Sequence, residues 1–371
     1  MRRLFFPVLV WGAALGGLAV VGFPAQANIP PGSSGKIVFG QVFPNYGATI
    51  NPDGSGEHDI GSAGHTTCNT LSPDGSKVLC NLWSSMGVPQ PATANPDGSH
   101  FRLLNQHLPF DLFCLNWSPN GKRLLCHSEG MANPADAGLY TARSSNASDL
   151  VRVSTTLPGG FDIGYGYSPD GSRILYARFD SKGHGALFSV KPDGSDPIRL
   201  SPRRLFVIDL GFFDRVGADW SPNNSRVTFA AFDSTAPSSR ALGVFVVRAA
   251  GTGLREITPH GLGALSAQWS PNGALIAFTS CKLPTKGCAL RRGQAWIVHP
   301  DGTGLRQVTR RADGGAFLTP TWSPNSHKLL VNNKNQHRFS LWTVNTHGSG
   351  LFKLETTPHF SQYEWGIAPT R

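Results

Sequence analysis

The residues best suited to bind a ligand are arginines and aromatic residues in the irregular segments between short apolar stretches. They are Arg203, Arg204, Phe206, Phe213, Arg215, Arg291, Arg292, Arg310, Arg311 and Arg338. Arginine binds carboxylates with a planar fork of N–H donors, and binding residues are commonly placed on loops carried by a rigid scaffold. We therefore expect these side chains to bind an anionic partner, either a protein or a polymer of the cell envelope. The alternative is a solvated basic surface with aromatic rings packed beneath its loops.

The six cysteines form three local pairs. These are Cys68 and Cys80, Cys114 and Cys126, and Cys281 and Cys288. The first two pairs have the same spacing, and each flanks a predicted hairpin turn, where facing positions of antiparallel strands come close enough for a disulfide. An even count with paired spacing predicts structural disulfides in an exported chain. A zinc site would need a cluster such as Cys-x-x-Cys, which the sequence lacks.

A turn motif recurs about every 49 residues, a period typical of repeat architectures. It reads aromatic or Leu, then Ser-Pro-Asp/Asn-Gly, and its serines are Ser72, Ser118, Ser168, Ser221, Ser270 and Ser323. Pro fixes φ at the second turn position, while Asp, Asn and Gly tolerate the conformations that close a hairpin. Asn224 and Ser326 replace the Gly in two copies. A second turn, often Pro-Asp-Gly as at Asp193 and Asp301, follows each motif.

Four antiparallel strands in each repeat of this length are typical of a β-propeller blade. The second strands are expected at 36–39, 77–80, 123–126, 173–176, 226–229, 275–278 and 328–331. The earliest of these has no first strand before it, whereas residues 363–366 form a first strand with no second strand after it. We predict an all-β propeller of seven four-stranded blades, in which the C-terminal strand completes the N-terminal blade and removes its exposed edge. Six blades is the alternative.

Composition favours a turn-rich β protein over a helical bundle or a disordered chain. Of 371 residues, 43 are Gly and 28 are Pro, while 40% are hydrophobic and only 15% are charged. Residues 1–27 begin with two arginines, continue with an apolar run and end in Ala25-Gln26-Ala27, the layout of a secretory signal peptide. We expect residues 28–371 to form one propeller domain in the periplasm, in the envelope or outside the cell, without a membrane span. Retention of the apolar run as an anchor is the alternative.

The repeats resemble the WD40-like propeller repeats of the TolB family, the periplasmic component of the Tol–Pal envelope system. The resemblance rests on Trp-Ser-Pro-Asn-Gly at 117–121 and 269–273 and on Pro-Asp-Gly-Thr-Gly-Leu-Arg-Gln-Val-Thr at 300–309, and it covers about residues 35–369. It implies a propeller that serves as a protein-interaction platform rather than an enzyme. We expect no counterpart of that family's N-terminal α/β domain, because the repeats begin close to the predicted cleavage site. Related repeats also form propellers in some peptidases and in oligogalacturonate lyases.

Signatures of catalysis are absent from the sequence. It has no Gly-x-Ser-x-Gly, His-Glu-x-x-His or Gly-x-x-x-x-Gly-Lys motif, and its 12 histidines are scattered. The turn Asp and Asn residues lack the alternating spacing of a calcium loop. We predict an exported, non-catalytic, monomeric binding scaffold without cofactor or metal, and no nucleic-acid partner despite a net charge of +10. The alternative is a polysaccharide-active enzyme, similar to oligogalacturonate lyase, with its site at the channel mouth.

Overall fold

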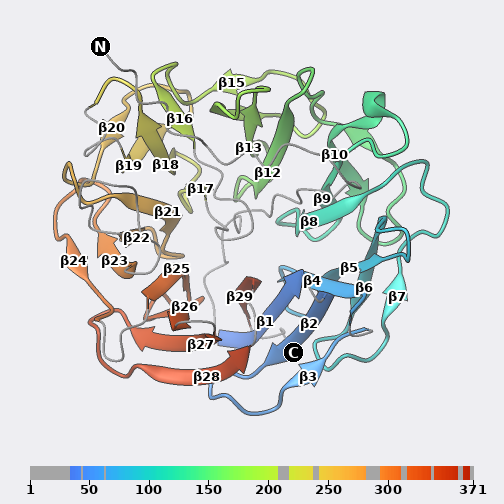
Figure 1. Cartoon of the computed structure of the whole chain (residues 1–371), viewed down its shortest axis with the longest axis horizontal. Helices are drawn as coiled ribbons and strands as arrows, with labels where there is room; N and C mark the ends of the chain where they lie inside the picture. Colours follow the sequence, from blue (N-terminus) through green and yellow to red (C-terminus); the bar gives the residue numbers. More distant parts are fainter. Residues whose placement is uncertain are drawn as a thin grey trace.

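The chain forms a ring of β-sheets around a central axis (Figure 1). The computed structural model describes residues 34–42, 45–61, 64–207, 217–236, 242–280, 293–310, 316–335, 338–357 and 362–367. Within these ranges the one helical element is a single 3₁₀ turn, η1 (Pro134–Asp136). The predicted all-β class is confirmed.

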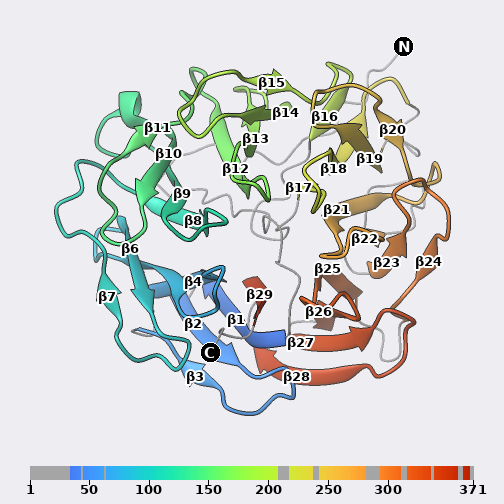
Figure 2. The ribbon, with the colours of Figure 1, turned by 180° about the vertical axis from the view of Figure 1, so that it is seen from behind.

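Five of the sheets have four antiparallel strands each. One sheet contains β4 (Thr66–Leu71), β5 (Val78–Trp83), β6 (Pro89–Ala94) and β7 (Arg102–Leu103). The next contains β8 (Phe113–Trp117), β9 (Arg123–Ser128), β10 (Gly138–Arg143) and β11 (Val151–Arg152). A third sheet contains β21 (Ala264–Trp269), β22 (Ile276–Ser280), β23 (Gln294–Val298) and β24 (Arg306–Gln307). A fourth contains β25 (Ala316–Trp322), β26 (Lys328–Asn335), β27 (Arg338–Asn345) and β28 (Phe352–Thr357). In each, the first strand lies nearest the axis and the fourth lies at the rim (Figures 1 and 2).

The fifth sheet joins the two ends of the chain, as the sequence predicted. It has the order β29 (Gln362–Ile367), β1 (Ser34–Val42), β2 (Asn45–Ile50), β3 (His58–Asp59). In β1, Ile37 pairs with Trp365 and Phe39 pairs with Tyr363. The phenolic oxygen of Tyr363 also donates to the carbonyl oxygen of Leu318 at 3.0 Å, so the closing strand is bonded to β25 of the neighbouring sheet.

The remaining sheet has nine strands. They are β12 (Phe161–Tyr167), β13 (Ile174–Phe179), β14 (Gly185–Val190), β15 (Ile198–Arg199), β16 (Leu205–Val207), β17 (Ala218–Trp220), β18 (Arg226–Asp233), β19 (Leu242–Arg248) and β20 (Arg255–Glu256). The short strand β16 pairs with both β14 and β18 and thereby links two four-strand units, β12–β15 and β17–β20. Division of the sheet at β16 would give seven blades, and this number stays a prediction.

Strand β16 requires a glycine on its neighbour. Gly185 pairs with Val207, and a Cβ atom at Gly185 would lie 2.5 Å from the carbonyl oxygen of Val207 and 2.5 Å from Cε1 of Phe179. Neither contact is compatible with a real side chain. Glycine is therefore the residue that lets the two units approach closely enough to share a strand.

The predicted turns and second strands lie where the motif places them. In the first copy, Oγ of Ser72 donates to Oδ1 of Asp74 at 2.6 Å, and Oγ of Ser72 accepts the amide of Lys77 at 2.9 Å. Ser76 donates its amide to Asp74 at 3.0 Å. The acidic turn residue is thus held by its own turn, which confirms its structural role.

The two copies that lack the turn glycine use the substituted side chain instead. Asn224 and Ser326 keep the left-handed conformation, with φ of 60° and 63°. Oδ1 of Asn224 accepts the amide of Asp170 at 3.0 Å, and Oγ of Ser326 accepts the amide of Asn272 at 3.1 Å. Each departure from glycine therefore adds a hydrogen bond to the corresponding turn of another repeat.

Two of the three predicted disulfides are present. Cys68 faces Cys80 in the β4–β5 pair, and Cys114 faces Cys126 in the β8–β9 pair; both are bonded. The third predicted pair, Cys281 and Cys288, lies outside the described residues.

Buried polar side chains connect the inner strands of adjacent sheets. Nδ2 of Asn116 donates to the carbonyl oxygen of Tyr165 at 3.2 Å. Oδ2 of Asp219 accepts the amide of Trp269 at 2.8 Å, and Oε1 of Gln268 accepts the amide of Trp322 at 3.3 Å. A buried polar group is costly unless it is hydrogen-bonded, so these contacts favour one alignment of each sheet against the next.

Candidate functional site

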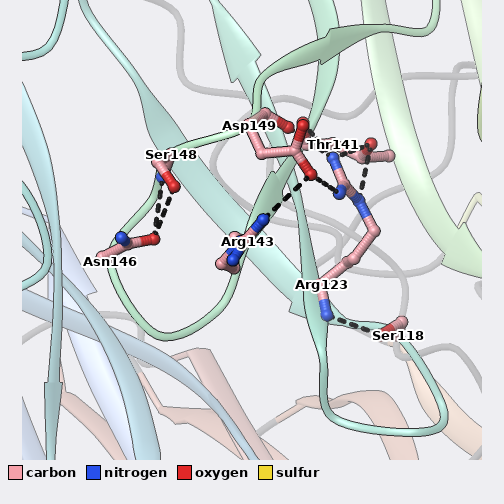
Figure 3. Close-up of polar contacts among 7 residues, drawn as sticks. All are labelled: Ser118, Arg123, Thr141, Arg143, Asn146, Ser148 and Asp149. Atoms are coloured by element: carbon pink, nitrogen blue, oxygen red, sulfur yellow. Dashed lines mark hydrogen bonds and ion pairs between the residues drawn. The ribbon is translucent and has the colours of Figure 1, made fainter.

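The ring has two faces of different character. One face, here called the turn face, carries the turns between first and second strands and between third and fourth strands. Figure 3 shows a turn-face arginine, Arg123, whose Nη1 lies 2.8 Å from Oδ2 of Asp149 and whose Nε donates to Oγ1 of Thr141 at 3.1 Å. Arg143 lies 3.8 Å from the same carboxylate. The two arginines share one carboxylate, and Arg123 is the one held close to it.

The opposite face, here called the loop face, carries the connections from second to third strands and from one sheet to the next. The structure places Arg203 and Arg204 between β15 and β16, and Phe206 within β16. Arg310 follows β24, and Arg338 begins β27, so these two arginines belong to other sheets. The other predicted site residues, Phe213, Arg215, Arg291, Arg292 and Arg311, lie outside the described residues. The structure therefore brings together three of the ten.

Arg204 is neutralised locally. Its Nε lies 3.1 Å from Oδ2 of Asp233, and its carbonyl oxygen accepts the amide and the hydroxyl of Ser234 at 2.9 and 3.0 Å. These contacts join the connection before β16 to the end of β18. Arg204 thus holds the loop in place and leaves little positive charge for a ligand.

Arg203 and Arg199 have no acidic partner among the residues that the structure describes. Burial lowers the pKa of Arg199, and the positive charge of Arg203 lowers it further. The Arg199 guanidinium lies over the Phe188 ring at 5.7 Å, and its Nε donates to the carbonyl oxygen of Ser201 at 2.8 Å. An anion bound between the two would relieve their repulsion.

Aromatic rings flank this charge. The rings of His184 and Phe206 are stacked, with centroids 4.6 Å apart and planes inclined by 23°. Nδ1 of His184 lies 3.2 Å from Oδ2 of Asp180, which orients the imidazole. We name the set Arg199, Arg203, Arg204, His184 and Phe206 the arginine–aromatic patch.

Sequence reasoning identified three of the five residues of this patch, Arg203, Arg204 and Phe206. Arg199 and His184 were not among the residues that the sequence predicted for the site. Arg199 is placed by the pairing of β15 with β14, in which it faces Phe188, and His184 is placed by its stack on Phe206 of β16. The sequence does show Arg199 close to Arg203 along the chain, and this closeness could have drawn attention to it.

The described residues contain no grouping of three or more His, Cys, Asp or Glu side chains that could hold a metal ion. They also include no helix long and apolar enough to cross a membrane. The arginine–aromatic patch thus contains cationic and aromatic side chains.

Comparison with known proteins supports the fold. No protein-family model matches the chain. An uncharacterized protein of Agrobacterium fabrum is 27% identical over 218 residues, which cover 58% of this chain. The chain spans 63% of that relative's length.

Solved structures similar to this chain are β-propellers. TolB from Acinetobacter baumannii is 13% identical with a TM-score of 0.54, over 91% of this chain and 68% of that one. An oligogalacturonate lyase in complex with manganese is also 13% identical, with a TM-score of 0.57 over 88% of this chain and 86% of that one. The class defined by the fold is the β-propeller. Within that class, its fold is similar to that of TolB.

Proposed function

We propose that this protein is a non-catalytic binding scaffold that presents its loop face to an anionic ligand, either an acidic protein or a carboxylate-bearing polymer of the cell envelope. The single observation that carries the proposal is the pair Arg199 and Arg203, whose charges are not offset by any acidic side chain among the described residues. The neighbouring stack of His184 and Phe206 supplies a flat surface. Charge-assisted contacts from arginine to carboxylates are among the stronger polar contacts available to proteins.

The proposal includes export. Residues 1–27 act as a cleaved signal peptide, and residues 28–371 form a single, monomeric propeller domain without a membrane anchor. The bonded pairs Cys68–Cys80 and Cys114–Cys126 support this placement, because disulfides persist in oxidising compartments. Sequencing the N-terminus of the protein isolated from cells tests it: a start at Asn28 is expected, and a start at Met1 in the membrane fraction would contradict it.

Binding to defined polymers tests the function itself. Purified protein is titrated with polygalacturonate, with poly-L-glutamate and with neutral dextran, and the reaction mixtures are assayed for new unsaturated or reducing sugar ends. We expect binding to at least one polyanion, none to dextran, and no product. Equal binding to dextran, or no binding at all, would refute the scaffold proposal. Product formation from polygalacturonate would instead favour the polysaccharide-active enzyme, a class that includes a propeller of similar fold.

A further inference from the structure

Two further arginines meet at the seam between the β8–β11 and β12–β15 sheets (Figure 1). Arg152 belongs to β11, and Arg178 lies near the end of β13. Both contact Thr155, an exposed residue of the connection between the two sheets. Nη2 of Arg178 donates to the carbonyl oxygen of Thr155 at 2.8 Å, and Nη1 of Arg152 donates to its hydroxyl at 3.2 Å. One guanidinium group from each sheet therefore lies at the same place.

The strand register connects this pair of arginines with Arg199 of the arginine–aromatic patch. Tyr176 pairs with Phe188, and Phe188 pairs with Arg199, so the three side chains lie on one face of the sheet. Arg178 is two residues beyond Tyr176 on the same strand and therefore points to the same face. This face packs on the β8–β11 sheet, since Tyr176 shares an apolar cluster with residues of that sheet.

An aromatic pair lies between the guanidinium groups of Arg178 and Arg199. The Tyr176 and Phe188 rings are stacked, with centroids 5.5 Å apart. The Arg178 guanidinium lies 5.5 Å from the Tyr176 centroid, and the Arg199 guanidinium lies 5.7 Å from the Phe188 centroid. Arg152, Arg178 and Arg199 thus follow one another along the seam, and we name them the seam arginines.

Each seam arginine keeps N–H groups that a ligand can use. Arg178 is 24% exposed in its side chain and donates from Nε and Nη2, whereas its Nη1 has no hydrogen-bond partner within the described ranges. Arg199 is exposed and donates from Nε alone among the described residues. Arg152 is partly exposed, and its Nε makes no hydrogen bond in the part of the chain that the structure describes.

The seam arginines differ in the net charge that they contribute. Asp162 neutralises Arg178, because its two carboxylate oxygens accept from Nε and Nη2 at 2.9 and 2.8 Å. Arg178 therefore contributes hydrogen bonds rather than net charge. Arg152 forms no ion pair with any described residue, and in this it resembles Arg199 and Arg203. Positive charge is thus present at both ends of the row.

We infer that the ligand is an extended chain of carboxylate-bearing sugars, which lies along the seam and contacts Arg152 as well as the arginine–aromatic patch. The inference rests on the proposed function and names its ligand class. Repeated carboxylates match a row of guanidinium groups, each of which can bind one carboxylate. The half-buried rings of Phe188 and Phe206 offer flat apolar surfaces that suit the C–H faces of sugar rings.

An acidic polypeptide fits this surface less well. Extended peptides that bind along a sheet pair their backbone with an exposed strand edge. The outer strands at this seam, β11 and β15, have two residues each. They offer too short an edge for such pairing, so recognition here depends on side chains.

Arg152→Gln tests contact at the seam. The wild type and the variant are titrated at one salt concentration with digalacturonate, hexagalacturonate, hexa-L-glutamate and uncharged maltohexaose. The wild type should bind hexagalacturonate most tightly, because only a long sugar chain reaches both sheets. Loss of one charge-assisted contact should weaken hexagalacturonate binding about tenfold. Digalacturonate, which the arginine–aromatic patch can hold alone, should bind the variant as it binds the wild type.

The matched control is Arg143→Gln, which removes the same charge from the turn face of the same sheet and should not change binding. A measurement on the wild type makes the test independent of how the variant folds. Phenylglyoxal modifies accessible guanidinium groups, and mass spectrometry gives the rate at each arginine. Hexagalacturonate should slow the modification of Arg152 and leave that of Arg143, whose side chain is 57% exposed, unchanged.

Four results would overturn the inference while leaving the proposed function in place. They are unweakened hexagalacturonate binding in Arg152→Gln, an equal loss for both sugar lengths, an unprotected Arg152, and tighter binding of hexa-L-glutamate than of hexagalacturonate. In each case Arg199→Ala/Arg203→Ala would still weaken binding of the anionic probes. Failure of every anionic probe to bind the wild type would instead refute the proposed function itself.

Discussion

The His184 ring stacks on the Phe206 ring at a centroid distance of 4.6 Å, and this contact joins the loop after β13 to the strand β16 that links two halves of a nine-stranded sheet. The same strand follows directly from the loop that carries Arg203 and Arg204. The position of the unpaired charge on the loop face therefore depends on a strand that lies outside the four-strand repeat.

His184→Ala tests the stack as part of the binding surface. Loss of one aromatic partner worth about 1 kcal/mol should weaken polygalacturonate binding about fivefold, because Phe206 loses the ring that orients it. The matched control is His347→Ala, an exposed histidine on the turn face, which should bind as the wild type does. The measurement is a titration of both variants under the same salt conditions, and equal affinities would argue against a role for the stack.

Gly185→Ala tests the strand linkage. The new Cβ meets the carbonyl oxygen of Val207 and the ring of Phe179 at 2.5 Å, so the variant should lose about 1–3 kcal/mol of unfolding free energy through overpacking. Gly183→Ala is the control, since a Cβ atom there meets nothing within 4 Å and the cost comes only from its φ of 77°. Denaturant unfolding of the two variants gives the difference, and a smaller loss for Gly185→Ala than for Gly183→Ala would contradict the packing argument.

The pH dependence of stability contains two opposing contributions, from His127 at the end of β9 and from Glu129 just after it. Glu129 has a folded-state pKa raised to about 7, so its contribution to stability is lost as pH rises from about 4.5 to 7. His127 has a folded-state pKa lowered to about 4, so its contribution is lost as pH falls from about 6.5 to 4. Between about pH 4.5 and 6.5 the two should largely cancel.

Glu129→Gln removes one of these contributions and should reveal the other. In this variant the unfolding free energy should rise by up to about 3 kcal/mol as the pH is raised from about 4 to 6.5. The unfolding free energy of the wild type should change little over the same interval. Chemical unfolding at a series of pH values measures the two slopes. Identical pH profiles for wild type and variant would exclude Glu129 as a buried titrating group.

The disulfide Cys114–Cys126 should stabilise the chain by restricting its unfolded state. Replacing both cysteines with alanine should lower the unfolding free energy by about 3 kcal/mol, the value for a loop of this size. The matched pair Cys68 and Cys80 has the same sequence separation and should give a similar loss. A reducing agent should destabilise the wild type more than the Cys114→Ala/Cys126→Ala variant, which retains only the Cys68–Cys80 bond of the two, and an equal response of both proteins would contradict this assignment.

The repeat and its closure could be predicted from the sequence because hairpin turns and ladder pairing are local. Pro, Asp and Gly determine each turn by their own backbone preferences, and the unpaired strands at 36–39 and 363–366 are complementary. The pairs Cys68–Cys80 and Cys114–Cys126 could be predicted because each turn places its two cysteines opposite each other on the strands that flank it. The roles of Asn224 and Ser326 could not be predicted from the sequence. Their side-chain oxygens accept the amides of Asp170 and Asn272, which belong to turns more than fifty residues away in the chain.

The site was only partly predictable because it depends on contacts between sheets. Arg203, Arg204 and Phe206 were selected by residue type and loop position. Which of these charges is neutralised depends on Asp233, at the end of a strand in the other unit. The properties of Asp111 and Glu129 were not predictable for the same reason, because they arise only when the loop after β9 folds over the connection between sheets.

The most direct test of the central claim is the affinity of Arg199→Ala/Arg203→Ala for polygalacturonate, compared with that of Arg226→Ala. Arg226 is an exposed turn-face arginine that begins β18, so its removal changes the net charge without changing the loop face. We predict that the double variant loses at least about tenfold in affinity, with a weaker salt dependence, and that Arg226→Ala binds as the wild type does. Equal affinities for all three proteins would contradict the claim that the loop face binds anions through these two arginines.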